Sequence, residues 1–204
     1  MFITFEGIDF CGKSTQVELL KKYLVNQDKK VEIIREPGGT EISELVRNIL
    51  LDKKLNKMFM ETEIFLFSAS RAQMVREKIQ PLLKRDVYVI SDRFHDSTTA
   101  YQGYGRGIGS ETVNHINKLA IDGTVPDITF FIDIPVEIAN SRKAKKMDSE
   151  LDRMELSDNI FFEKVRNGYR KIAKNESRFR VIDGTLGVDK IHSIIIDEIN
   201  LLEK

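Results

Sequence analysis

A glycine-rich segment near the start of the chain has residue types and spacing suited to binding phosphate. Residues 7–14 read Gly-Ile-Asp-Phe-Cys-Gly-Lys-Ser and match the pattern G-x-x-x-x-G-K-[ST]. In such a loop, glycines let backbone N–H groups converge on an anion, the lysine reaches the terminal phosphates, and the serine hydroxyl can bind Mg²⁺. The pattern predicts a nucleotide site formed by Gly7, Ile8, Asp9, Phe10, Cys11, Gly12, Lys13, Ser14 and Thr15.

The segments on either side of this loop supply the elements that it needs. Residues 1–6 are strand-like and apolar, and residues 13–25 have helical spacing. The apolar positions Val17, Leu20, Leu24 and Val25 are predicted to share one helix face. A strand aims the loop, and the helix places the positive end of its dipole behind a bound phosphate.

The rest of the chain alternates strand-like and helical patterns. Apolar runs of strand length occupy residues 2–5, 31–34, 87–90, 128–132 and 179–182, and helical patterns occupy residues 61–84, 109–122, 159–174 and 188–203. None of the apolar runs alternates cleanly, which predicts strands buried on both faces. We therefore expect one α/β domain over residues 1–204, with a parallel sheet flanked by helices on both faces.

Polar residues stand where these strands are predicted to end: Glu6, Arg35, Asp92, Asp133 and Asp183. Ligands of open α/β sheets bind at the carboxyl ends of the strands. We predict that Asp92 joins Ser14 at a metal site, although a carboxylate in this position also serves as a helix cap.

The choice between a GTPase, a motor ATPase and a small-molecule kinase depends on other residues. The Asn-Lys-x-Asp motif of GTPases is absent from the sequence. Arg35, Arg47, Arg71 and Arg93 all lie near predicted strand ends. A site that joins two anionic phosphates needs several cations, and arginine binds phosphate through a bidentate fork. These observations favour a kinase.

Bulk composition excludes several other classes of protein. The 32 basic residues balance the 32 acidic ones, so binding to nucleic acid or to an anionic membrane surface is not expected. Cys11 is the only cysteine, which suits a reducing compartment. No apolar run approaches the ~20 residues of a membrane span, and the early strand leaves no room for a signal peptide. We expect a soluble cytoplasmic protein.

Four segments resemble the thymidylate kinase family. Residues 92–103 (Asp-Arg-Phe-His-Asp-Ser-Thr-Thr-Ala-Tyr-Gln-Gly) resemble its signature, and residues 35–40, 65–71 and 150–155 resemble the segment after its second strand, its base-binding helix and its lid. Asp9 in the phosphate loop also matches. The resemblance implies a P-loop NTPase fold with a five-stranded parallel sheet. It also implies a homodimer that phosphorylates dTMP to dTDP with ATP and Mg²⁺.

The resemblance also implies which residues contact the base and the sugar of dTMP. It implies that Phe67 stacks on thymine, that Arg71 bonds a base carbonyl and that Gln102 reads the pyrimidine edge. Tyr101 would lie under the sugar, where a 2′-hydroxyl would crowd it. Phe67 also suits an ordinary core position, but an arginine on its helix face argues against that reading. Two further residues, Ser97 and Thr98, are expected to contact the base or the Gln102 side chain, or else to cap a helix.

The phosphate of dTMP is assigned to Arg93 and Arg47 on the same grounds. Asp9 would approach the sugar 3′-hydroxyl or the metal shell, and Glu36 would act through water. Surface exposure for Arg47, and turn stabilisation for the two carboxylates, are the ordinary structural alternatives. Since the second pKa of a phosphomonoester is about 6, the acceptor is already a nucleophilic dianion and needs no general base.

The charged segment around residues 142–154 reads either as a solvated helix end or as a lid that brings cations over a phosphate. By resemblance, Arg153 would act with Lys13 and Arg93 on the transferring phosphate, and Arg142 would stack on adenine. Lys145 and Lys146 match less closely. Residues 183–187 lie where the family contacts adenine, and a plain strand-to-helix turn fits them equally well.

The phosphate loop departs from the family pattern at two positions. The family usually has glycine, or in some members arginine, where this chain has Phe10, and a small residue where it has Cys11. Phenylalanine cannot supply the positive charge that this arginine brings to the transferring phosphate. We therefore expect that charge to come from the lid, from Arg153 and its neighbours.

Two alternatives stay open beside the thymidylate kinase reading. One is a kinase of the same architecture that acts on a nucleoside or on another monophosphate. The other is a non-catalytic nucleotide-binding protein. His95, His115 and His192 are scattered in the sequence, and we expect surface or capping roles for them.

Overall fold

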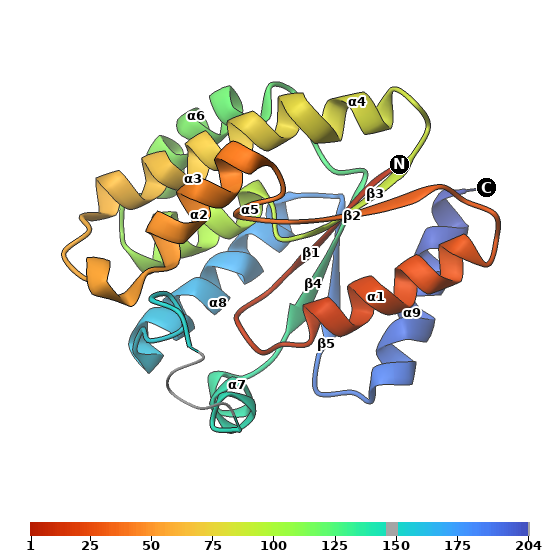
Figure 1. Cartoon of the computed structure of the whole chain (residues 1–204). Helices are drawn as coiled ribbons and strands as arrows, with labels where there is room; N and C mark the ends of the chain where they lie inside the picture. The colour runs from red at the N-terminus through yellow and green to blue at the C-terminus, as the bar shows by residue number, and fades with distance from the viewer. Residues whose placement is uncertain (146–150, 204) are drawn as a thin grey trace.

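The computed structural model describes residues 1–145 and 151–203 (Figure 1). Its strands are β1 (Phe2–Glu6), β2 (Val31–Arg35), β3 (Tyr88–Asp92), β4 (Ile128–Asp133) and β5 (Phe179–Asp183). They form one five-stranded parallel sheet in the order β2-β3-β1-β4-β5. The predicted strands are confirmed, and each ends at the polar residue expected there.

The two edge strands correct one expectation. β2 and β5 each have a single neighbour in the sheet, so they are only partly covered. Val181 in β5, for example, is 57% exposed. Burial on both faces therefore holds for the inner strands only, because a pattern without alternation does not separate an edge strand from a central one.

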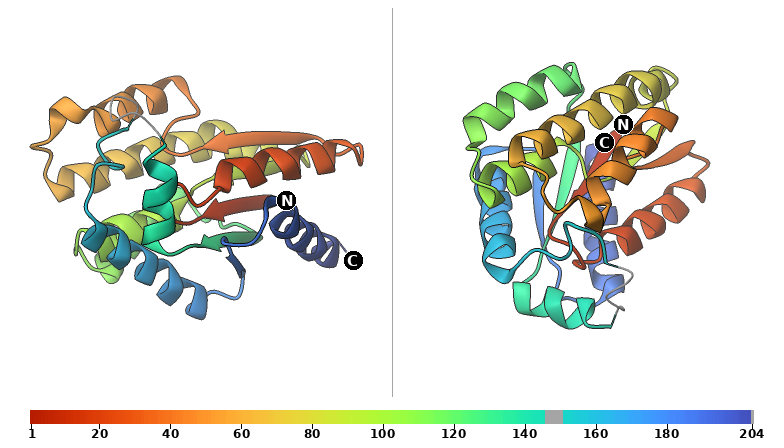
Figure 2. Two further views of the ribbon diagram at one scale, coloured as in Figure 1. Left: turned by 90° about the horizontal axis from the view of Figure 1, so that it is seen from below. Right: turned by 60° about the vertical axis from the view of Figure 1, so that its left-hand side comes forward.

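Helices cover both faces of the sheet (Figure 2). They are α1 (Lys13–Val25), α2 (Glu41–Leu51), α3 (Met60–Met74), α4 (Gln80–Leu83), α5 (His95–Thr98), α6 (Ser110–Ile121), α7 (Val136–Lys143), α8 (Asn159–Asn175) and α9 (Val188–Leu202). α1 and α9 pack together on one face, and α4 and α8 contact strands on the other. Among the described residues, every helix is too short or too polar to span a lipid bilayer.

In the described part of the chain, three short segments have other helical geometries. η1 (Lys53–Leu55) is a 3₁₀ turn, whereas η2 (Val75–Ile79) and η3 (Thr99–Gly105) are π-helical. η2 joins α3 to α4, so the helix predicted over residues 61–84 is continuous but widened in its middle. η3 continues α5 and carries residues expected to bind the substrate.

The helix that follows the phosphate loop has the predicted bounds and a narrower buried face than expected. Val17, Leu20 and Leu24 are buried in the main core, whereas Val25 is 48% exposed. Val25 is the last residue of α1. The loops after β1, β2, β3, β4 and β5 all emerge at the carboxyl edge of the sheet, because all five strands are parallel.

Candidate active site

The phosphate loop joins β1 to α1 at this carboxyl edge. Gly7 has φ 142°, and a Cβ there would lie 2.6 Å from the carbonyl oxygen of Ile132, so only glycine fits. Phe10 has φ 64°, a left-handed conformation that glycine adopts without strain. The glycine that the family resemblance implies at this position would adopt the same conformation without strain.

Lys13 is buried beneath the loop. Its Nζ donates hydrogen bonds to the carbonyl oxygens of Gly7 (3.2 Å) and Ile8 (3.0 Å). These two carbonyls therefore hold the ammonium group within the concave side of the loop. A phosphate bound there would meet a cation that is already in place.

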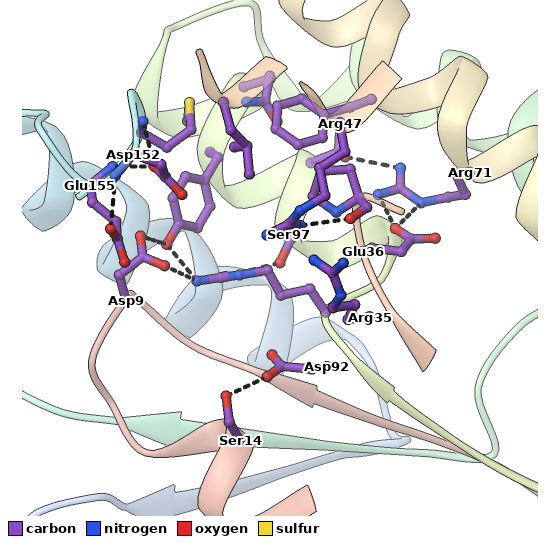
Figure 3. Close-up of a pocket in the computed structure, with 18 residues that line it drawn as sticks. Asp9, Ser14, Arg35, Glu36, Arg47, Arg71, Asp92, Ser97, Asp152 and Glu155 are labelled. Carbon is purple, nitrogen blue, oxygen red and sulfur yellow. Dashed lines mark hydrogen bonds and ion pairs between the residues drawn. The ribbon is translucent and has the colours of Figure 1, made fainter. Parts of the chain in front are cut away.

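Ser14 and Asp92 meet as predicted, although 78 positions separate them in sequence. Ser14 Oγ donates a hydrogen bond of 2.8 Å to Asp92 Oδ2 (Figure 3). Both groups are oxygen donors, the type that Mg²⁺ prefers, so the pair fits a site completed by phosphate oxygens and water. Within residues 1–145 and 151–203, no group of three or more His, Cys, Asp and Glu side chains forms a metal cluster.

Arg93 follows β3 and faces the phosphate loop. Its backbone has φ 74°. Nη1 donates to the carbonyl oxygen of Gly7 at 2.8 Å, and Nη2 forms an ion pair with Asp9 and donates to the hydroxyl of Tyr101 at 3.1 Å. Burial would raise the pKa of Asp9, but the charges of Arg93 and Lys13 outweigh it and lower that pKa. Asp9 is therefore an anion at neutral pH.

A cavity of about 270 Å³ opens beside Arg93 (Figure 3). Every residue that the sequence analysis assigned to the acceptor lines it: Asp9, Glu36, Arg47, Phe67, Arg71, Arg93, Ser97, Thr98, Tyr101 and Gln102. Arg35 also lines it, so the four arginines near the strand ends do gather at one site. Asp152, Met154 and Glu155, from the segment before α8, lie on the same wall and were not predicted.

A second cavity, of about 590 Å³, lies over the phosphate loop. Its lining includes loop residues 9–15, Arg142 from α7, and Gly184 and Leu186 from the turn after β5. Gly7 and Ile8 do not line it, and instead provide the carbonyls that bind Lys13. The two cavities share Asp9, Ser14, Asp92, Arg93 and Glu155. A donor phosphate and an acceptor phosphate would therefore meet at Arg93.

The comparison with known proteins agrees with this geometry. The family model described as "Thymidylate kinase" matches residues 5–195. The chain belongs to the thymidylate kinase family. The thymidylate kinase of Thermosipho africanus (strain TCF52B) is 52% identical, over 96% of this chain and 95% of that protein. The thymidylate kinase of Kosmotoga olearia (strain ATCC BAA-1733 / DSM 21960 / TBF 19.5.1) is 48% identical, over 100% and 97%. A crystal structure of thymidylate kinase from Ehrlichia chaffeensis superposes with a TM-score of 0.78, at 38% identity and 98% coverage of both chains.

Arg71 overturns the argument that an arginine on the helix face of Phe67 speaks against burial of that face. Although Arg71 lines the acceptor cavity, its side chain is only 2% exposed, so an arginine on this helix face does lie within the protein. An ion pair of 2.6 Å with Glu36 neutralises the guanidinium, which also donates to Thr98 Oγ1 (2.9 Å), to Asn117 Oδ1 (3.3 Å) and to a backbone carbonyl. A hydrogen bond from Arg71 to a thymine carbonyl, which stays a prediction, would have to replace one of these.

The lid arginine, Arg153, does not lie where the thymidylate kinase resemblance placed it. Its Nε donates to the carbonyl oxygen of Leu50 at 2.8 Å, and its Nη1 pairs with Glu63 Oε2 at 2.6 Å. Arg153 lines neither cavity, because the buried carboxylate of Glu63 holds it behind the acceptor site. Lys145 is exposed at the end of α7, and Lys146 and Glu150 lie outside the described residues.

Among the described residues of the segment 142–154, Arg142 reaches the loop. Its Nη1 donates to the carbonyl oxygen of Phe10 at 3.0 Å, and its Nη2 donates to that of Gly184 at 3.2 Å. These bonds tie α7 to the phosphate loop and to the turn after β5. Of residues 183–187, Gly184 and Leu186 line the cavity over the phosphate loop, and their contact with adenine stays a prediction.

The hydroxyls of Ser97 and Thr98 are engaged by protein groups other than Gln102. Ser97 Oγ donates to Glu6 Oε2 at 2.6 Å and hydrogen-bonds the hydroxyl of Tyr169 at 2.7 Å, whereas Thr98 Oγ1 accepts from Arg71. The expected contact of these residues with Gln102 is therefore not made in this structure.

Glu6 and Tyr169 support Arg93, a role that the sequence analysis did not assign to either, although it placed Glu6 at a strand end. Tyr169, on α8, donates to Glu6 Oε2 at 2.8 Å and accepts from Arg93 Nη1 at 3.3 Å. Burial, and then the charge of Asp96, raise the pKa of Glu6 to about 7. A tyrosine 76 positions away from Arg93 carries no local sign of this role. The only signal is its spacing of seven from Phe162 and four from Val165, which marks the buried face of α8.

His95 corrects the expectation of a surface role. Its ring stacks on that of Phe94 with centroids 5.0 Å apart, and burial lowers its pKa to about 4. It is therefore a neutral core residue at physiological pH, positioned behind the acceptor site.

Proposed function

We propose that this chain carries out the thymidylate kinase reaction, in which ATP phosphorylates dTMP to give dTDP and ADP. The observation that carries the proposal is the pair of cavities that meet at Arg93. One lies over a phosphate loop and the other is lined by the residues expected to bind dTMP. In-line transfer between two bound phosphates needs this arrangement, because catalysis consists of positioning and charge stabilisation.

ATP is assigned to the cavity over the phosphate loop. Its phosphates would accept hydrogen bonds from the backbone of residues 9–15, and its adenine would lie against Arg142 and the turn at residues 184–186. Ser14 and Asp92 would hold Mg²⁺, which when bound neutralises charge on the phosphate oxygens. Lys13 supplies a further positive charge from beneath the loop.

dTMP is assigned to the cavity beside Arg93. Phe67 would stack on the base, Tyr101 would exclude a 2′-hydroxyl, and Arg93 with Arg47 would bind the phosphate. Asp9 would approach the sugar 3′-hydroxyl, and Glu36 would act on the acceptor through water. Thus Arg93 would change partners on substrate binding, since in this structure it is paired with Asp9.

The direct test is an acceptor screen with ATP and Mg²⁺. Purified protein is incubated with each nucleoside monophosphate, with thymidine, and with water as the only acceptor, and ADP is measured. We expect dTMP to give by far the highest rate. ADP formation no faster with dTMP than with water would refute the proposal. A preference for thymidine would indicate a nucleoside kinase, and ATP binding without transfer to any acceptor would indicate a non-catalytic protein.

We also propose that the chain is a single-domain cytoplasmic enzyme that forms a homodimer. Ile42, Leu45 and Ile49 recur at helical spacing on α2 and are 52%, 61% and 45% exposed. An apolar helix face left open to solvent is typical of a protein interface. A second copy of the chain is the simplest partner, and it would cover this face in both subunits by symmetry.

A further inference from the structure

Gln102 has one buried polar atom with no partner in the described part of the chain. The side chain is 1% exposed and lies on the wall of the acceptor cavity. Its Nε2 donates a hydrogen bond of 2.9 Å to Glu63 Oε1. Its Oε1 has no hydrogen bond. A buried acceptor without a donor is unfavourable, so a ligand that supplies a donor to this oxygen would be favoured.

Glu63 determines that the Gln102 side-chain amide turns its Nε2 end, and not its Oε1 end, toward the carboxylate. Arg106 donates to both carboxylate oxygens, through Nε at 3.1 Å and Nη2 at 3.2 Å, and Arg153 Nη1 adds a bond of 2.6 Å. Burial would raise the pKa of Glu63, but the hydrogen bonds and charge of Arg106 outweigh it and lower that pKa. An ionised carboxylate only accepts, so the amide must present its NH₂ group to Glu63.

We infer that Glu63 is a specificity-determining positioning residue, which holds the Gln102 amide so that its oxygen accepts the N3–H of an imide base. This inference rests on the proposed assignment of dTMP to the cavity. Thymine and uracil carry a hydrogen at N3, whereas neutral cytosine carries a lone pair there. With cytosine, two acceptors would face each other.

A flip of the Gln102 amide would not relieve this repulsion when cytosine is bound. A reversed Gln102 would place Oε1 against the carboxylate of Glu63, which has no proton to share. A site built to hydrogen-bond a donor rejects a ligand that lacks it far more strongly than an apolar pocket rejects a change in size. Arg153 thereby acquires a role in base selection, because it helps to keep Glu63 charged.

Glu63→Gln tests the inference. The new NH₂ group would face two charged donors at the Oε2 position, Arg106 Nη2 and Arg153 Nη1, but only one at the Oε1 position, Arg106 Nε. The Oε1 position is therefore favoured, and there the NH₂ group removes the acceptor that fixes Gln102. We expect the ratio of kcat/KM for dTMP over dCMP to fall at least about tenfold.

Internal controls separate this effect from general loosening of the site. The ratio for dTMP over dUMP should stay within about twofold, since both bases are imides and differ only in the methyl group. Glu61→Gln, which removes an exposed carboxylate two positions earlier on α3, should leave both ratios unchanged. In a Gln102→Met background, Glu63→Gln should change the dTMP to dCMP ratio by less than about twofold, as expected when one residue acts through the other.

The outcomes are distinguishable from failure of the proposed function. A wild-type protein inactive on dTMP would overturn the function and this inference with it. An active wild type, together with a folded Glu63→Gln variant that keeps full selectivity against dCMP, would overturn the inference alone. If Glu63→Gln does not fold, Glu63→Asp keeps the charge but withdraws it from Gln102, and the same loss of selectivity is expected.

Discussion

Arg93 shows how a single residue is held ready for chemistry. Its positive φ of 74° is unfavourable for a side chain other than glycine by about 1–2 kcal/mol. Its guanidinium bonds Gly7, Asp9, Ser97, Tyr101 and Tyr169, which come from four parts of the chain. Several hydrogen bonds of about 1 kcal/mol each offset the backbone strain, and more so when a charge is involved. The network orients the cation before a substrate arrives.

Replacement of Arg93 by alanine should lower kcat about 100-fold or more, because a preorganised cation at the transferring phosphate would be lost. ATP affinity, measured by calorimetry without acceptor, should change less than about threefold, since Lys13 and the loop remain. Arg85→Ala, at an exposed arginine, is the control and should behave as wild type. Loss of ATP binding in Arg93→Ala would mean that Arg93 belongs to the donor site.

Glu6 predicts a pH dependence of stability. Its pKa in the folded protein is raised from 4.5 to about 7, so protonated Glu6 contributes stability that is full below about pH 4.5 and is lost as pH rises to about 7. Glu6→Gln mimics the protonated form. Relative to wild type, it should gain on the order of 2–3 kcal/mol between pH 4.5 and 8, at about 1.4 kcal/mol per pKa unit.

Urea unfolding of both proteins at several pH values measures this difference. A constant offset between wild type and Glu6→Gln across the range would show that Glu6 stays ionised in the folded protein. A curve that rises and then levels near pH 7 would support the assignment.

At the scale of elements, the contact between α8 and η3 positions Tyr101 and Gln102, which we propose bind the sugar and the base. Gly168 on α8 lies against Tyr104 of η3, where an added Cβ would come within 2.9 Å of the Tyr104 Cβ. Gly105 of η3 lies equally close to Phe161 and Val165 of α8. Small residues on both elements therefore permit their close approach. Because η3 carries Tyr101 and Gln102, this packing places one wall of the cavity beside Arg93.

Gly168→Ala should destabilise the protein by about 1–3 kcal/mol, since overpacking forces α8 and η3 apart. KM for dTMP should rise while ATP affinity is kept, because only the acceptor wall is moved. Thermal unfolding and steady-state kinetics provide the two measurements. Gly187→Ala is a matched control, because no atom lies within 4 Å of a Cβ added there and φ is −63°. Equal effects of the two substitutions would contradict the packing argument.

At the scale of the whole molecule, the exposed apolar face of α2 predicts the oligomeric state. Leu45→Glu should weaken the homodimer at least about tenfold, because a charge would be buried without a partner in the interface. Sedimentation velocity over a range of concentrations measures the change. Val188→Glu introduces the same charge at a position of similar exposure, 50%, on α9, and should leave the dimer intact. A wild-type protein that is monomeric at high concentration would refute the interface.

Tertiary context also explains which sequence expectations failed. Val25 and the edge strands follow the same local patterns as their buried counterparts, yet Val25 ends α1 and is half exposed, and β2 and β5 lie at the edges of the sheet. Arg71 is buried because Glu36, which lies 35 positions away, neutralises it. Arg153 lies away from the phosphate loop because Glu63, 90 positions away in sequence, binds its guanidinium. In each case the deciding partner is distant in sequence.

The sequence by itself determined the phosphate loop, the order of strands and helices, and the polar residues at the strand ends. These features are local, because they depend on glycine spacing and on the periodicity of apolar residues. Only the tertiary structure decided that Tyr169 supports Arg93, that Glu63 orients Gln102 and that Arg142 rather than Arg153 reaches the loop. Such pairings depend on which charges and hydrogen-bonding groups are buried together, and periodicity carries no information about that.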